Sequence, residues 1–326
     1  MPLPTSASDV TETVKNAAQA NGSIAQAARA ASGAPVRVTS TSVVAARPAS
    51  AIASVIRTST VARKVGFAPP VSTTGSSAPR VGLVSAHTGA RTLITATGIN
   101  YDLYTFLSTG ANTFVVGDGN VTADIFVLGG GGHGAWGGGG GGGLSITSNV
   151  SIPAGTYTVT VGAGASRQSG FTIGSNGGDS TITVSGTTYR GVGGGSSTRN
   201  GGCGGGNGGV GSQGFNGGDA GAFSGGGGGG MGAAGSGFNG GAGIDSTFSG
   251  TNVTYGGGGG GGLDSGVNPA LLANGGAGGG GNGGWGGTGG GSDGTNGLGG
   301  GGGGNHRTNM SQGPGGHGRV MIRVRK

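Results

Sequence analysis

The sequence predicts a mostly β protein: a β-sandwich interrupted by a large glycine-rich insertion packed as polyglycine-II helices, preceded by an N-terminal helix and an extended arm. Three observations lead to this prediction. Of the 92 glycines, 10 lie in residues 1–128 and the other 82 lie in residues 129–326. Alternating β-type runs flank the glycine-rich part on both sides. Charged residues make up only 8% of the chain, against about 25% in an ordinary globular protein.

The N-terminal part, residues 1–92, is basic. It carries nine Lys/Arg and two acids, a net charge of +7, whereas residues 93–326 carry eight of each sign. Asp9 and Glu12 have capping-box spacing, and a thin stripe of Val, Ile and Ala follows until Gly33 and Pro35, so we expect one helix there. Residues 36–92 fit an extended attachment arm, and residues 93–112 a connector.

Residues 113–326 form the predicted glycine-rich β domain. Thr113–Val116 and Thr122–Leu128 are β-type runs joined by a Gly-Asp-Gly-Asn turn. Further expected strands cover residues 144–152, 156–161, 180–184, 187–192 and 319–325. The last of these places Val320, Ile322 and Val324 on one face, and it has no local partner. It therefore belongs to the same sandwich, and residues 193–318 are the insertion.

The glycine runs of the insertion have two physical readings, a flexible linker or an ordered bundle. Ordering each glycine costs roughly 0.5–1 kcal/mol more than ordering an alanine, so only direct packing of backbones can offset the cost. Polyglycine-II helices allow this, because their N–H and C=O groups point outward and no side chain keeps the chains apart. Runs of similar length between turn-like segments favour the bundle over a linker.

Several motifs together resemble the glycine-rich domain at the C-terminus of many bacteriophage tail proteins. They are the strand Ile125–Leu128 running into Gly129–Gly132, the segment Ile152–Gly164 (IPAGTYTVTVGAG), and the terminal Gly318–Ile322 (GRVMI). The opening Met1–Ser6 (MPLPTS) resembles the start of such tail proteins. The interior is similar in kind to the tail-fibre tip adhesins of T-even phages. The resemblance implies a virion protein that recognises a host at a fibre or tail tip.

Other classes of function lack their residues. The three lysines exclude a phosphate-binding loop, the four histidines show no metal-ligand spacing, and the single Cys203 excludes a disulfide framework. We expect no enzymatic activity, no cofactor and no metal. The arginines of the arm are spread out with almost no aromatic residue between them, which argues against nucleic-acid binding. No apolar stretch is long enough for a membrane span or a signal peptide.

The candidate contacts with a receptor are the aromatic and polar residues between the glycine runs, where they could stack on sugars or on protein loops. They are His133, Trp136, Phe215, Phe238, Asn239, Tyr255 and Trp285. The alternative for each of them is a spacer wedged between glycine helices. The candidate residues for docking on other virion proteins are Arg29, Arg37, Arg47, Arg57, Arg63 and Lys64.

We therefore expect a bacteriophage tail-fibre or tail-tip adhesin located in the virion, with a host polysaccharide or outer-membrane protein as receptor. The resemblance is compatible with a homotrimer and with a single copy. The alternative is a purely structural virion component, such as a fibre, tail or capsid decoration subunit, without receptor contact. An ice-binding or wall-type glycine-rich protein is a more distant alternative, which the phage-like opening disfavours.

Overall fold

The computed structural model describes residues 82–168, 174–219, 221, 224–264, 266, 273–286, 289–306 and 311–326. The chain divides into two units, Met1–Gly75 and Ser76–Lys326, and every described residue belongs to the second. The predicted N-terminal helix lies outside the described residues, as does the arm up to residue 81. The described part is all-β, as predicted, and contains no helix.

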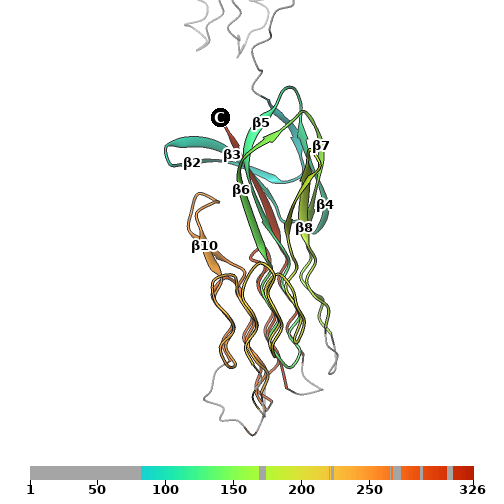
Figure 1. Cartoon of the computed structure of the whole chain (residues 1–326), viewed down its shortest axis with the longest axis vertical. Coiled ribbons are helices and arrows are strands. Elements are labelled where there is room, and N and C mark those ends of the chain that lie inside the picture. The colour runs from blue at the N-terminus through green and yellow to red at the C-terminus, as the bar shows by residue number, and fades with distance from the viewer. Residues whose placement is uncertain are drawn as a thin grey trace, which may run out of the picture. The chain divides into compact units, whose positions relative to one another are not determined.

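In the described residues, twelve strands form two five-stranded antiparallel sheets and one small hairpin (Figure 1). The first sheet contains, in spatial order, β1 (Val84–His87), β4 (Gly110–Val116), β7 (Gly155–Val161), β8 (Ser180–Val184) and β9 (Thr187–Gly191). The second contains β2 (Ala90–Ala96), β3 (Ile99–Phe106), β12 (Arg319–Arg325), β5 (Val121–Leu128) and β6 (Leu144–Ile152). The hairpin contains β10 (Ile244–Ser246) and β11 (Val253–Tyr255). Strands β1 to β3 occupy segments predicted as arm and connector, so the sheets begin earlier in the chain than expected.

The C-terminal strand β12 follows the glycine-rich insertion and returns to the centre of the second sheet. It pairs with β3 on one side and β5 on the other, with Ile322 opposite both Tyr104 and Ile125. A seven-residue strand in the centre of a sheet is bonded along both edges, which explains why the last residues of the chain belong to this fold. The prediction that residues 319–325 complete the sandwich is confirmed.

The core lies between the two sheets and follows from the alternation of side chains along the strands. Val320, Ile322 and Val324 face inward, as predicted, and meet inward residues of the first sheet such as Val159 and Ile182. Phe114 is fully buried among them, with its ring centroid 5.3 Å from that of Tyr104 and 6.4 Å from that of Phe106, both edge to face. Such pairs contribute about 0.5–1.5 kcal/mol beyond the area they bury.

The outer face of the second sheet carries a second, smaller core. Leu103, Phe126, Leu128 and Met321 point outward from β3, β5 and β12, and Phe248 and Tyr255 of the β10–β11 hairpin cover them. The Phe126 centroid lies 5.4 Å from Phe248 and 5.0 Å from Tyr255. The hairpin therefore attaches the glycine-rich part to the sheet through side chains, in addition to the strands that continue into it.

The glycine runs extend from one end of the sandwich and pack backbone against backbone (Figure 1). Successive amides of residues 138–143 donate to three neighbouring segments in turn, and the order repeats every third residue. Gly138 and Gly141 donate to Gly226 and Gly229, Gly139 and Gly142 to Gly302 and Gly299, and Gly140 and Gly143 to Gly195 and Val192. The central run is thus bonded on three sides, a pattern that neither a sheet nor a flexible linker has.

Contacts between the runs leave no space for side chains. A Cβ added to Gly259 would lie closer than 3.0 Å to the carbonyl oxygen of Gly302. A Cβ added to Gly301 would be equally close to the carbonyl oxygen of Gly139. Neither glycine has a positive φ. Glycine is therefore required at these positions because of close approach and not because of backbone conformation.

Candidate functional site

The glycine-rich part has a distal end, which we define as the turns farthest from the sandwich. Residues 129–135 continue β5 and residues 137–143 lead into β6, so Trp136, in the turn between them, lies at this end. Gly262 donates to the Trp136 carbonyl at 2.7 Å, Gly261 donates to that of Phe238 at 2.8 Å, and Leu263 forms a bridge with Trp285. Trp136, Phe238, Asn239 and Trp285, four of the seven predicted contact residues, therefore gather there.

Among the described aromatic side chains of the distal end, that of Trp136 is the most exposed, with 44% of its surface accessible. Its ring centroid lies 4.7 Å from that of His306, with 33° between the planes. His306 Nδ1 in turn lies 3.9 Å from Asp264 Oδ1. The arrangement combines a flat apolar surface with polar groups at its side, which is suited to a sugar ring or to a protein side chain.

Phe238 and Asn239 form a corner next to this surface. Phe238 and Trp285 are half-buried, whereas Asn239 is exposed. The Asn239 Oδ1 accepts a hydrogen bond of 2.9 Å from the Asn274 backbone N–H, and the Gly240 N–H donates to the Asn274 carbonyl at 2.8 Å. The amide oxygen of Asn239 is therefore already used within the protein, and Nδ2 is the group that it can offer to a ligand.

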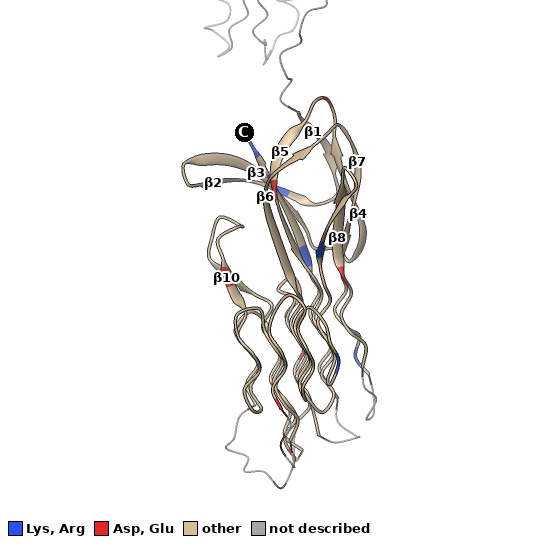
Figure 2. Ribbon diagram, viewed as in Figure 1, with Lys and Arg blue, Asp and Glu red and all other residues tan. Residues whose placement is uncertain are grey.

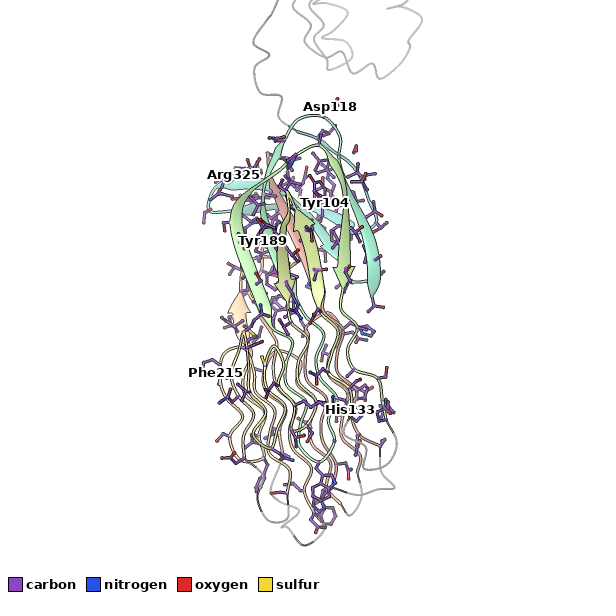
Figure 3. All side chains as sticks on the ribbon, turned by 45° about the vertical axis from the view of Figure 1, so that its right-hand side comes forward. Tyr104, Asp118, His133, Tyr189, Phe215 and Arg325 are labelled. Carbon is purple, nitrogen blue, oxygen red and sulfur yellow. The ribbon has the colours of Figure 1, made fainter. Side chains whose placement is uncertain are left out.

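Phe215 lies apart from the distal end, on the flank of the glycine-rich part nearer the strands (Figure 3). Its backbone N–H donates to Gly230, which lies at the proximal end of its run, and 48% of its side chain is exposed. Phe215 is therefore separate from the distal residues with which it was predicted to form a contact surface.

His133 and Tyr255 are fully buried, so the expectation that they lie at an exposed surface does not hold. Tyr255 belongs to the outer core described above, and its hydroxyl accepts a hydrogen bond of 3.3 Å from Arg319. His133 lies between glycine runs, where its Nε2 accepts a hydrogen bond of 3.1 Å from the Gln168 N–H. His133 therefore lies between runs, as the spacer alternative expected, whereas Tyr255 belongs to a side-chain core. Burial, and secondarily the positive charge of Arg167, lower the pKa of His133 to about 4.

The buried His133 predicts a loss of stability in acid. The unfolded chain takes up this proton near the ordinary pKa of 6.5 and the folded chain only near 4, so the free energy of unfolding falls as the pH drops through that interval. We expect His133 to account for about 1–2 kcal/mol of that fall, allowing for solvent screening. Urea unfolding at several pH values, compared with that of His133→Gln, measures it. A pH dependence that is the same in both proteins would contradict the assignment.

A family model described as a glycine-rich domain matches residues 107–325, two thirds of the chain. The chain belongs to the glycine-rich domain family. The matched part begins at the end of β3 and contains all the glycine runs and β12. No curated protein matches the sequence of this glycine-rich domain protein.

Three residues at the distal end of this glycine-rich domain were not predicted as contact residues from the sequence: Leu263, Asp264 and His306. Their distance from Trp136 along the chain exceeds 120 residues, and only the packing of the runs brings them together. A local signal exists for a second group, the asparagines that directly precede glycine at the turns.

Charged side chains are sparse on the described glycine-rich domain (Figure 2). The six proposed docking residues between Arg29 and Lys64 lie outside the described part.

Among the residues that the structure describes, no group of three His, Cys, Asp or Glu could hold a metal ion, and no helix is long and apolar enough to cross a membrane. Cys203 is buried, and burial raises the pKa of its thiol to about 12.

Proposed function

We propose that this protein is a tail-fibre or tail-tip adhesin of a bacteriophage virion, and that its distal end binds a receptor on the host surface. The observation that carries the proposal is the gathering of Trp136, Phe238 and Trp285 at the distal end, where slightly less than half of the Trp136 surface is exposed. Aromatic side chains that gather at one accessible place on a surface are typical of binding sites, whereas a single exposed aromatic side chain is not.

The positions of Gly82 and Lys326 support receptor binding at the distal end. Gly82 donates to the Asn120 carbonyl, beside the β4–β5 turn, and Lys326 donates to the Asn100 carbonyl, so both lie at the end of the sandwich opposite the glycine runs. The runs therefore project away from both chain ends of the described part. In the proposal, the part of the chain before the sandwich, residues 1–81, docks on other virion tail or fibre proteins through Arg29, Arg37, Arg47, Arg57, Arg63 and Lys64.

We further propose that the glycine runs are polyglycine-II helices. The three-residue repeat of hydrogen bonds in residues 138–143 supports this, because that helix has three residues per turn. No glycine from 137 to 143 has a positive φ, which agrees with the same geometry. A bundle of this kind gives the aromatic residues a rigid support, which lowers the entropic cost of binding.

In this proposal the protein binds without catalysing a reaction and without a cofactor, and its receptor is a host polysaccharide or an outer-membrane protein. Trp136→Ala tests it. We expect roughly tenfold or greater loss of affinity for the cells that the virion infects, the effect typical of an aromatic anchor. Binding of the labelled full-length protein to those cells measures it.

The matched control is Phe215→Ala, which removes a similarly exposed aromatic side chain from the flank. We expect it to bind as the unchanged protein does. If both variants fold, enter virions and bind normally, the alternative of a purely structural virion component takes the place of this proposal.

A further inference from the structure

Eight asparagines in the described part are followed directly by glycine, and all eight lie at or beside turns between glycine runs. They are Asn176, Asn200, Asn207, Asn216, Asn239, Asn274, Asn282 and Asn296. Asparagine before glycine is the dipeptide that deamidates most readily, because glycine has no side chain to hinder the approach of its backbone nitrogen. These eight pairs are therefore the candidate sites of this reaction in the described part of the chain.

Deamidation has fixed geometric requirements. The backbone nitrogen of the glycine attacks Cγ of the asparagine, a C–N bond forms, and the Cγ–Nδ2 bond breaks. Ammonia leaves with the proton of the glycine amide, and a succinimide ring remains. Water then opens the ring at either carbonyl and gives aspartate or isoaspartate. The asparagine side chain must be free to turn, and the glycine N–H must not be held in a hydrogen bond.

Seven of the pairs are doubly restrained. In each of them the asparagine Oδ1 accepts a backbone N–H of another segment, at 2.5–3.0 Å. The N–H of the following glycine also donates to a backbone carbonyl, at 2.8–3.3 Å. The asparagines thus serve as side-chain acceptors that complete the backbone hydrogen bonding at the margins of the runs.

Asn274–Gly275 differs from the other seven in both respects. No hydrogen bond within the described part reaches the Asn274 side chain, which is exposed. The Gly275 N–H donates at 2.9 Å not to a backbone carbonyl but to Oδ1 of Asn282, which is itself an exposed side chain. A side-chain acceptor can swing away by rotation of its own bonds, whereas a backbone carbonyl inside the bundle cannot do so without local opening.

We propose that Asn274 is the deamidation site of the folded protein, and that the Asn282 side chain sets its rate. Deamidation changes the surface next to Phe238 and Asn239. The Asn274 N–H donates a hydrogen bond to Asn239 Oδ1, and the Asn274 carbonyl accepts one from the Gly240 N–H. Aspartate adds a negative charge at this surface. Isoaspartate inserts a methylene group into the backbone and displaces one of the two hydrogen bonds. This proposal does not depend on the nature of the receptor.

Peptide mapping by mass spectrometry after incubation of the full-length protein in mildly alkaline heavy-oxygen water tests the proposal. Only a deamidated residue acquires the heavy oxygen, and each of the eight sites is measured in the same sample. We expect Asn274 to deamidate about fivefold or more faster than each of the other seven, since one net hydrogen bond is worth about that factor. In the unfolded chain all eight should react at similar rates.

Variants of Asn282 separate the proposed cause from simple exposure. Asn282→Ala removes the acceptor of the Gly275 N–H, and we expect deamidation of Asn274 to become about fivefold faster. Asn282→Asp retains an acceptor oxygen and should keep the original rate. Asn207 and Asn216 serve as internal controls for the integrity of the bundle. Equal rates at Asn274 and the restrained sites would overturn the site assignment, and an unchanged rate in Asn282→Ala would overturn the role of Asn282.

Discussion

In the variant Gly259→Ala, the free energy of unfolding is expected to be lower than in the unchanged protein by about 3 kcal/mol, the upper end of the usual cost of overpacking. The added methyl group would overlap the carbonyl oxygen of Gly302, whose position is fixed by hydrogen bonds in the middle of the bundle. A side chain at this site could be accommodated only by separating two runs, and the amides of both runs would then lose their partners. Urea or thermal unfolding of the full-length protein measures the change.

The control for this prediction is the same substitution at a position without neighbours. No atom of the described residues lies within 4 Å of a Cβ placed on Gly289, and Gly289 is not among the described glycines with positive φ. Gly289→Ala should therefore stabilise the protein by about 0.4–1 kcal/mol, through the lower entropy of the unfolded chain. The two substitutions are chemically identical and have opposite expected signs. Equal effects would mean that the close packing of the runs does not determine stability.

Prediction from the sequence succeeded where a pattern was local. The alternation of Val320, Ile322 and Val324 predicted a strand and its inward face, and both are observed. The β2–β3 hairpin was not predicted. Its turn residues Thr97 and Gly98 both have positive φ, 50° and 77°, as a tight hairpin turn requires. A β-branched residue such as threonine rarely adopts positive φ, so the dipeptide Thr-Gly does not signal this turn in the sequence.

Contacts between distant segments could not be predicted in this way. The run Ile125–Leu128 is apolar at every position, which is typical of a strand buried on both faces. The sequence does not say what covers the second face, because β10 and β11 have only three residues each and lie among glycines. Tyr255 was consequently predicted to lie at the surface, and it is part of a core together with Phe248. The pairing of Trp136 with His306 depends on the same long-range packing.

A second large effect is expected at the ion pair between Asp124 of β5 and Arg323 of β12. The Asp124 side chain is 5% exposed, and its Oδ2 accepts hydrogen bonds of 2.8 and 3.1 Å from the Arg323 guanidinium. The guanidinium lies between two rings, 4.6 Å from the centroid of Tyr101 and 4.5 Å from that of Phe248. The pair therefore connects two central strands of the sheet to the loop of the β10–β11 hairpin.

Asp124→Ala should destabilise the protein by about 3–5 kcal/mol, because it leaves the Arg323 charge without its partner in a largely buried place. It also removes the Oδ1 acceptor of the Asn149 N–H, at 2.9 Å, which is where the β5–β6 register shifts. Asp124→Asn separates these two contributions, since it keeps an acceptor for Asn149 and removes the charge. Its expected cost is smaller than that of Asp124→Ala.

The exposed pair Arg167–Asp293 provides the matched control, since its side chains are 46% and 57% exposed. Asp293→Ala should change the free energy of unfolding by at most about 1 kcal/mol. The double variant Asp124→Leu with Arg323→Met should be more stable than Asp124→Ala, because no unpaired charge remains and both replacements can join the apolar outer core. A double variant no more stable than Asp124→Ala would mean that lost packing, and not the uncompensated charge, causes the destabilisation.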